Sequence, residues 1–182
     1  MLIKLDTTAF GRVGDRFIGA SKQGPLAVRR ALKHTGDKAR TAMRKALPAQ
    51  TGLKAGTINR AVKGQMRGDR YVIESRGGNV RLKYFGARET RKGVSAAPWG
   101  HRQVFANTFM RGGHFPNRVK LNMGGHVYRR SGSGRTPIEG GRSGLFIPKE
   151  MITGSSERAF YATAERDLGP RVVHELLRIL GA

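Results

Sequence analysis

The sequence predicts an α+β fold in a single domain for this chain of 182 residues. Three observations lead to this class. An amphipathic helical pattern lies near the N-terminus, runs of β-branched and aromatic residues occupy the middle, and a second helical pattern lies near the C-terminus. We therefore expect a long N-terminal amphipathic helix packed on a small antiparallel sheet, with a C-terminal helix and long Gly/Arg-rich loops. Residues 1–24 are expected to form an N-terminal arm.

The clearest element is a helix over residues 25–47. Apolar and basic side chains separate onto opposite sides when the segment is set at 100° per residue. Pro25 suits the first turn, Pro48 marks the stop, and Gly36 indicates a kink or a close contact. The basic side suits either contact with phosphate groups or simple solvation. It contains Arg30, Lys33, Lys38, Arg40, Arg44 and Lys45.

The middle of the chain predicts short strands. Tyr71–Ser75 and Val80–Phe85 are expected to pair as a hairpin, because a Gly-Gly-Asn turn separates two β-branched and aromatic runs. The helix is expected to pack on this hairpin. Residues 86–100 are interpreted as a loop, since proline and glycine interrupt every regular pattern. Val104–Met110 and His126–Arg129 are further candidate strands.

The last third combines a flexible loop with helix. Residues 131–144 are rich in Gly, Ser and Arg and are expected to be mobile unless a partner orders them. Leu145–Pro148 is a short apolar anchor. The C-terminal helical segment, 155–180, is expected to begin at a Ser155 or Ser156 cap and to break or bend at Gly169-Pro170. Its neutral, apolar-rich surface suits packing on the domain's own sheet or on a neighbouring copy.

Charge is the strongest compositional signal. Lys and Arg total 35 against 12 Asp and Glu, a net charge of +23. Residues 1–149 hold 31 basic and 7 acidic side chains, whereas residues 154–182 hold four of each. This excess predicts attraction to polyanions, although a basic face with no partner is the simpler alternative. The absence of cysteine excludes disulfides and thiolate-bound metals. No signal peptide or 18-residue apolar run is present, so we expect a soluble protein without a membrane partner.

Signals for enzymatic chemistry are weak. The five histidines are scattered, paired carboxylates are missing, and no P-loop pattern occurs, so neither catalytic residues nor a cofactor nor a metal is expected. Residues 140–144 could nest a phosphate through backbone N–H groups. Seven aromatic side chains among the basic residues suit either a base-stacking surface or the core of a small sheet. They are Tyr84, Phe85, Trp99, Phe105, Phe109, Phe115 and Tyr128.

Several stretches resemble a known family. A long helix is followed by Pro48-x-x-Thr51-Gly52-Leu53, then by ARETRKGVSAAPWG (87–100), GGHVYRR (124–130) and RTPIEGGRSGLFIP (135–148). Their order and spacing are similar to those of the lambda-type phage minor tail protein Z family, the tail-completion or neck proteins of long-tailed phages. The similarity runs from about Arg29 to Leu180.

The resemblance implies a non-enzymatic structural virion protein at the head-proximal end of the tail, which helps to join the tail to the head connector around the DNA path. It implies copies arranged in a ring, contact with tail terminator or tube proteins and head connector proteins, and location in the virion, with assembly in the host cytoplasm. Phage DNA would be attracted without sequence preference. The candidate DNA- or ring-facing residues are Arg30, Lys33, Arg40, Arg44, Arg129, Arg130, Arg135 and Arg142.

Two other function classes fit parts of the pattern. A sequence-nonspecific nucleic-acid-binding protein of ribosome-like or nucleoid-like type would share the charge and the glycine content. The neutral C-terminal helix and the aromatic middle favour the phage structural protein over this alternative. An enzyme acting on nucleic acid would need carboxylates that the sequence lacks.

Overall fold

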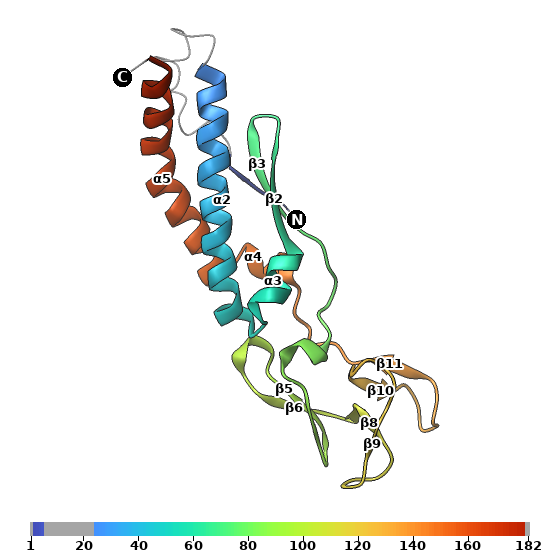
Figure 1. Ribbon diagram of the computed structural model, residues 1–182. Coiled ribbons are helices and arrows are strands. Elements are labelled where there is room, and N and C mark those ends of the chain that lie inside the picture. The colour runs from blue at the N-terminus through green and yellow to red at the C-terminus, as the bar shows by residue number, and fades with distance from the viewer. Residues whose placement is uncertain (1, 6–23, 181–182) are drawn as a thin grey trace.

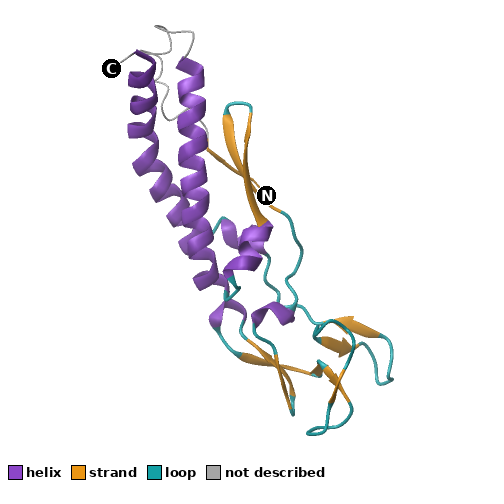
Figure 2. Cartoon of the chain, viewed as in Figure 1, coloured by secondary structure: helices purple, strands orange, loops and turns teal. Residues whose placement is uncertain are grey.

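The computed structural model describes residues 2–5 and 24–180 and shows an elongated molecule with two lobes (Figure 1). Residues 24–75 and 147–180, together with strand β1, form the helical lobe. Residues 76–146 form the β-lobe. Figure 2 shows that the long helices belong to the helical lobe, whereas the β-lobe consists of short strands, loops and short helical turns. The α+β class is therefore confirmed.

Two long antiparallel helices are the backbone of the helical lobe. α2 (Gly24–Thr51) and α5 (Gly154–Leu180) lie side by side along their length (Figure 1). Short helices α3 (Ala55–Ala61) and α4 (Ile147–Met151) lie near the C-terminal end of α2 and the N-terminal end of α5. The buried apolar residues of one contact cluster between the long helices are Ala27, Ala31, Leu32, Leu168, Val172 and Leu176.

Both prolines that were expected to interrupt these helices lie inside them. α2 continues past Pro48 to Thr51. A hydrogen bond from the Gly52 amide to the Pro48 carbonyl, at 2.9 Å, stabilises this last turn of the helix. α5 continues past Pro170, so the predicted break is absent. Pro170 is exposed, and solvent can satisfy the carbonyl that has lost its amide donor. Burial of Leu168 and Val172 on either side keeps the helix packed.

A three-stranded antiparallel sheet covers α2 on the side away from α5 (Figure 1). Its order is β1–β3–β2, with β1 at Leu2–Leu5, β3 at Arg70–Ser75 and β2 at Val62–Arg67. Tyr71 faces Leu5 on one side and Met66 on the other. Of the expected N-terminal arm, residues 2–5 form β1, Gly24 begins α2, and the rest lies outside the described residues.

The predicted hairpin between Tyr71–Ser75 and Val80–Phe85 is wrong. β3 pairs with β2 through a tight Gly68-Asp69 turn instead. The segment from Val80 meets residues 141–145: the Val80 amide donates to Leu145 O at 2.9 Å, and the Leu82 amide donates to Gly141 O at 3.2 Å. Residues 82–85 then form a short 3₁₀ helix, η2, which buries Leu82 and Phe85. A long-range partner thus replaced the local turn. The packing of helix α2 on β3 is confirmed.

The β-lobe contains three small antiparallel sheets, with strand orders β4–β5–β6, β11–β10–β7 and β8–β9. Residues 86–100, expected as a loop, include two paired strands and a 3₁₀ turn, η3 (Pro98–Gly100). The strand expected over 104–110 is divided at Asn107, whose φ is 58°. The strands are β4 (Arg88–Thr90), β5 (Gly93–Ala96), β6 (Gln103–Ala106), β7 (Thr108–Phe109), β8 (Arg111–Gly112), β9 (Val119–Lys120), β10 (Tyr128–Arg130) and β11 (Ile138–Gly140).

The segment 131–144 is not a structureless loop. Its residues 138–140 form β11 and pair with β10. The backbone of Arg142 forms an isolated antiparallel β-bridge with that of Arg81. Ser143 is buried, and its hydroxyl donates to the Val80 carbonyl at 2.7 Å. The strand expected at 126–129 lies at 128–130. Glycine and serine content suggested mobility, but long-range pairing with residues 80–82 provides hydrogen bonds that composition does not reveal.

One hydrophobic core connects the two lobes. Met43 and Leu47 of α2 belong to the same buried cluster as Val94 and Val127 of the β-lobe. Leu145 of the predicted apolar anchor is also fully buried in this cluster. The β-lobe is therefore packed against the helical lobe and not attached by a linker alone.

Candidate functional site

The eight predicted basic residues do not form one surface. Arg30 and Lys33 line a groove between α2 and α5, and Arg40 and Arg44 contact β2. The other four belong to the β-lobe: Arg129 and Arg142 line one cavity, Arg130 lines another, and Arg135 is exposed between β10 and β11.

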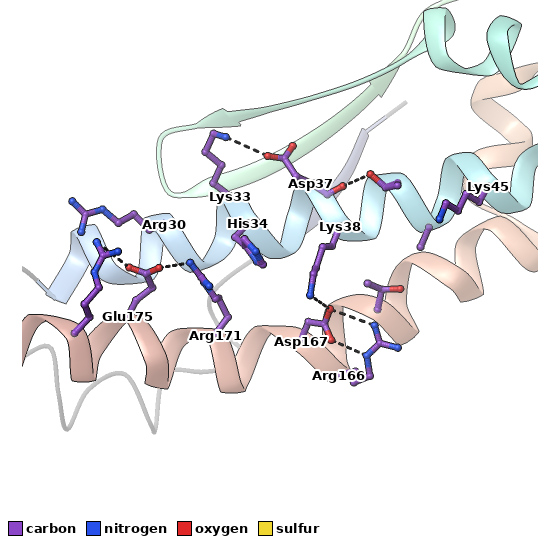
Figure 3. A pocket seen from close by; sticks show the side chains of 14 residues that line it. Arg30, Lys33, His34, Asp37, Lys38, Lys45, Arg166, Asp167, Arg171 and Glu175 are labelled. Carbon is purple, nitrogen blue, oxygen red and sulfur yellow. Dashed lines mark hydrogen bonds and ion pairs between the residues drawn. The ribbon is translucent and has the colours of Figure 1, made fainter. Parts of the chain in front are cut away.

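The groove between the two long helices has a volume of about 870 Å³ (Figure 3). Eight basic side chains and three acidic ones line it, and most of these charges form pairs. Lys38 donates to Asp167 at 3.1 Å, and Arg166 donates to the same carboxylate at 2.7 Å. These hydrogen bonds, the one from Arg166 first, lower the pKa of Asp167 to about 2. The basic residues are Arg30, Lys33, His34, Lys38, Lys45, Arg166, Arg171 and Arg178.

A buried carboxylate lies at the other end of this groove. The side chain of Glu175 is only 1% exposed, and it accepts a hydrogen bond from Arg171 at 2.6 Å. Arg178 Nη2 lies 3.6 Å from its second oxygen, and Figure 3 shows Glu175 beside Arg171. Burial, with the charges of Arg171 and Lys38, lowers the pKa of His34. The groove is therefore a charged seam in which the Lys38–Asp167 pair joins α2 to α5, whereas the other ion pairs each lie within one helix.

Arg40 and Arg44 hold β2 against α2. The Arg40 guanidinium donates to Gly64 O at 3.4 Å and forms an ion pair with Asp37 at 3.0 Å. Arg44 donates to the carbonyl oxygens of Val62 and Asn59. Burial lowers the pKa of the Arg44 guanidinium. These two side chains cap the edge of the sheet, which reduces what they can offer to DNA or to another ring.

Gly36 is the site of a close contact, one of the two expectations for it. A Cβ at this position would lie 2.2 Å from Cγ of Tyr71, whose ring is buried against the helix. The Tyr71 hydroxyl donates to Asp37 at 2.6 Å. Burial and this hydrogen bond raise the pKa of Tyr71. Burial alone would raise the pKa of Asp37, but bonds from Tyr71 and Lys33 and the charge of Arg40 outweigh it and lower the pKa.

The Pro48-x-x-Thr51-Gly52-Leu53 turn forms the junction between the lobes. The Thr51 hydroxyl donates to Leu47 O at 2.7 Å and accepts from the Leu53 amide at 3.3 Å. Gly52 has a φ of 75°, and a Cβ there would lie 2.6 Å from Ala97 O. Leu53 is buried in the core. Each residue of the turn thus has a structural reason for its type: a capping hydroxyl, a left-handed glycine and an apolar anchor.

A polar network that the sequence analysis missed completes this junction. The Gln50 side-chain amide donates to Glu150 Oε2 at 2.8 Å, and its oxygen accepts from the Ser156 amide at 3.0 Å. Trp99 donates from Nε1 to Glu150 Oε1 at 2.9 Å. The first turn of α5 is therefore capped by Gln50 of α2, whereas the Ser156 hydroxyl donates to the carbonyls of residues 150 and 153. No local pattern signals a cap supplied from 106 residues away.

The β-lobe has a larger excess of basic over acidic residues than the helical lobe. Residues 76–146 contain 14 Lys and Arg but only two acidic residues. Glu139 lies 3.7 Å from Arg129, and Glu89 pairs with Arg118. Two cavities open among these cations. One of about 500 Å³ includes Arg129, Glu139 and Arg142. The other, of about 460 Å³, is lined by five basic residues and no acidic one: Arg91, Lys92, Arg111, Arg118 and Arg130.

Arg91, Lys92 and Arg111 are candidate binding residues that the sequence analysis did not select. They lie in the β4–β5 turn and at the start of β8. The available signal was the low acid content of the segment, since Glu139 is the sole carboxylate between Arg91 and Lys149. Their convergence could not be predicted, because the β4–β5 turn lay in a segment expected as a loop and Arg111 lay just beyond the strand expected over 104–110.

The aromatic residues of the middle segment divide between the two interpretations. Phe85 is in the core, whereas Tyr84, Trp99 and Phe115 are exposed. Phe109 lies under the Arg130 guanidinium, 5.5 Å from its carbon to the ring centre. The ring therefore supports a cation of the β-lobe surface and also packs against Tyr128.

The chain matches no protein-family model, no curated protein and no solved structure. Across residues 2–5 and 24–180, no group of three or more His, Cys, Asp or Glu is placed to hold a metal ion. The helices in that part of the chain include none that is long and apolar enough to cross a membrane. The candidate functional features that the geometry provides are the cation surfaces of the β-lobe and the junction.

Proposed function

We propose that the chain is a structural protein of a phage tail or neck, working as copies in a ring at the head-proximal end of the tail. Neighbours would include tail terminator or tube proteins and head connector proteins, and phage DNA would be attracted by nonspecific electrostatics. No catalytic step is assigned to it. The protein would act in the virion after assembly in the host cytoplasm.

The unequal charge of the two lobes is the observation that carries this proposal. Residues 24–75 and 147–180 hold 17 basic and 8 acidic side chains, and three of these carboxylates, Asp37, Asp167 and Glu175, form ion pairs along the helices. The β-lobe holds 14 against two. A subunit of a ring around DNA needs one surface for packing and another that tolerates a polyanion. The sequence resemblance supports the same assignment, and its turn motif forms the junction between these surfaces.

A sequence-nonspecific nucleic-acid-binding protein of ribosome-like or nucleoid-like type is the second candidate. The unpaired cations of the β-lobe favour it as well, because phosphate attraction alone is enough for such binding. The two candidates differ in what the protein joins. A tail or neck protein should remain with the particle after nuclease treatment, whereas a nucleoid-like protein should be released with the digested nucleic acid.

Deletion of the gene from the phage genome that carries it tests the proposal. We expect separate filled heads and incomplete or unjoined tails in electron micrographs. A plasmid that supplies the chain should restore joined particles, and the same plasmid with an early stop codon should not. Joined, infectious particles in the absence of the chain would contradict the proposal.

A further inference from the structure

We propose that the β-lobe binds the phosphate backbone of nucleic acid at the cavity that Arg91, Lys92, Arg111 and Arg130 line. We call this cavity the cation groove. This inference deepens the proposed function, on which it rests for the identity of the polyanion as DNA. It assigns the contact to one surface of the subunit and separates that surface from the basic side of α2.

The cation groove is built from distant segments that converge. The β4–β5 turn provides Arg91 and Lys92, β8 provides Arg111, and β10 ends with Arg130. Its volume is about 460 Å³, and none of its twelve lining residues is acidic. A backbone φ of 58° at Asn107 turns the chain from β6 into β7, which forms another part of the wall.

Two of the five cations are held in place by the protein. Arg118 forms an ion pair with one carboxylate oxygen of Glu89. The other oxygen of Glu89 accepts a hydrogen bond from the Met110 amide at 2.8 Å. Arg130 donates to the Gly134 carbonyl at 3.1 Å and lies over the Phe109 ring. A guanidinium has five N–H donors, so Arg130 keeps others for a ligand. These contacts position the groove wall before any ligand arrives.

The other three cations are available. Arg91, Lys92 and Arg111 are exposed, and within the described chain they make no ion pair or side-chain hydrogen bond. The two carboxylates of the β-lobe, Glu89 and Glu139, pair with Arg118 and Arg129 and not with these three cations. Three neighbouring cations without counter-charge repel each other, and a bound anion removes that cost.

An extended polyanion fits this surface better than a small anion. One phosphate would neutralise only part of the groove, and the rest of the β-lobe would keep its excess positive charge. A nucleic-acid backbone places further phosphates along the same surface and gains entropy from released counterions. An acidic protein segment would satisfy the charge too, so it is treated as an outcome of the test.

Binding of the full chain to duplex DNA, measured at several salt concentrations, is the test. The groove variant is R91Q/K92Q/R111Q. The matched control is R29Q/R30Q/K45Q, which removes three positive charges from exposed positions of α2. Two unrelated duplexes of equal length serve as probes, and circular dichroism checks that each variant is folded. The test also compares displacement of DNA by inorganic phosphate and by NaCl at equal ionic strength.

We expect the slope of log K against log salt to become less negative by about 0.9 for each phosphate contact that is lost. The groove variant removes three cations, so its slope should change by about 2–3. The control should keep the parent slope, both duplexes should bind alike, and phosphate should compete no better than NaCl. Equal losses in both variants would overturn the proposal, because general charge would then explain binding. Stronger competition by phosphate would overturn it in favour of a small-anion site.

The assembly experiment separates this inference from the proposed function. A groove variant with parental DNA binding that fails to restore joined particles would place an acidic protein partner in the groove. That result would overturn the inference and leave the structural role intact. A groove variant with weakened DNA binding, in a phage whose particles form without the chain, would support the inference and refute the tail or neck role.

Discussion

The helical lobe and the β-lobe use charge in opposite ways. In the helical lobe, Asp37, Asp167 and Glu175 each bind two basic side chains, and the pairs lie across or beside the α2–α5 seam. In the β-lobe, 14 basic residues share two carboxylates. One of these ion pairs, Lys38–Asp167, joins α2 to α5, and the others lie within a single helix. Most cations of the β-lobe, by contrast, have no carboxylate partner among the described residues.

This difference shows why net charge alone says little about a binding surface. The sequence pattern indicates the basic side of α2 as a candidate phosphate contact. In the fold, however, Arg40 and Arg44 donate hydrogen bonds to carbonyl oxygens of β2. Arg91, Lys92 and Arg111 of the β-lobe, in contrast, form no ion pair with any of the described residues.

The largest effect is expected where the two lobes share their core. Met43 is completely buried, so M43D places an unpaired charge there and should cost about 3–5 kcal/mol of unfolding free energy. L26D, at a residue that is 51% exposed on the same helix, is the matched control and should cost far less. Urea unfolding followed by Trp99 fluorescence and by far-UV circular dichroism measures both. Transitions of the parent that do not coincide would show that the lobes unfold separately.

The junction should show the next largest effect. G52A forces an L-residue to a φ of 75° and puts a Cβ 2.6 Å from the backbone oxygen of Ala97, so we expect a loss of about 2–4 kcal/mol. Gly68 also has a positive φ, 59°, but open space surrounds it. G68A should therefore lose only about 1–2 kcal/mol. Equal losses in urea unfolding would mean that Gly52 serves the turn alone and not the contact between lobes.

A smaller effect is expected where α2 meets the sheet. G36A brings a Cβ to 2.2 Å from the buried Tyr71 ring and should destabilise the fold by about 1–3 kcal/mol despite the better helix propensity of alanine. Gly56 in α3 has nothing within 4 Å, so G56A should be neutral or stabilising by up to about 1 kcal/mol. Thermal melting and urea unfolding measure both variants. A stabilised G36A would contradict the close approach of the ring.

The smallest effect is expected from the charged seam. The pKa of Asp167 is about 2 in the fold, below its ordinary value of 3.8, so its stabilising contribution is present above pH 4. That contribution should disappear as the pH falls from about 4 towards 2. D167N should lack this part of the acid-induced loss of unfolding free energy. D69N, in the exposed β2–β3 turn, should show the same loss as the parent. Urea titrations between pH 6 and 2 decide the matter. Identical pH profiles of unfolding free energy for parent and D167N would contradict a stabilising role for the Asp167 ion pairs.

Local patterns predicted the long elements well, because helical periodicity reports burial directly. The amphipathic helix over 25–47 and the helical segment over 155–180 were both found, with ends displaced by a few residues. Pairing in the β-lobe could not be predicted in the same way. Val80 looked like the start of a hairpin strand, but its hydrogen bonds go to residues 143 and 145. Partners this far apart leave no periodic signal in either segment.

What the sequence by itself determined is the α+β class, the two long helices, the strong positive charge and the glycine that permits close packing at residue 36. Those features follow from residue type and local spacing. Only the tertiary structure decided which cations are free. The partner of a polar side chain depends on other chain segments, 18 residues away for Arg44 and Val62 and 106 for Gln50 and Ser156. Arg91 and Arg111 line a cavity with no acidic side chain among the described residues.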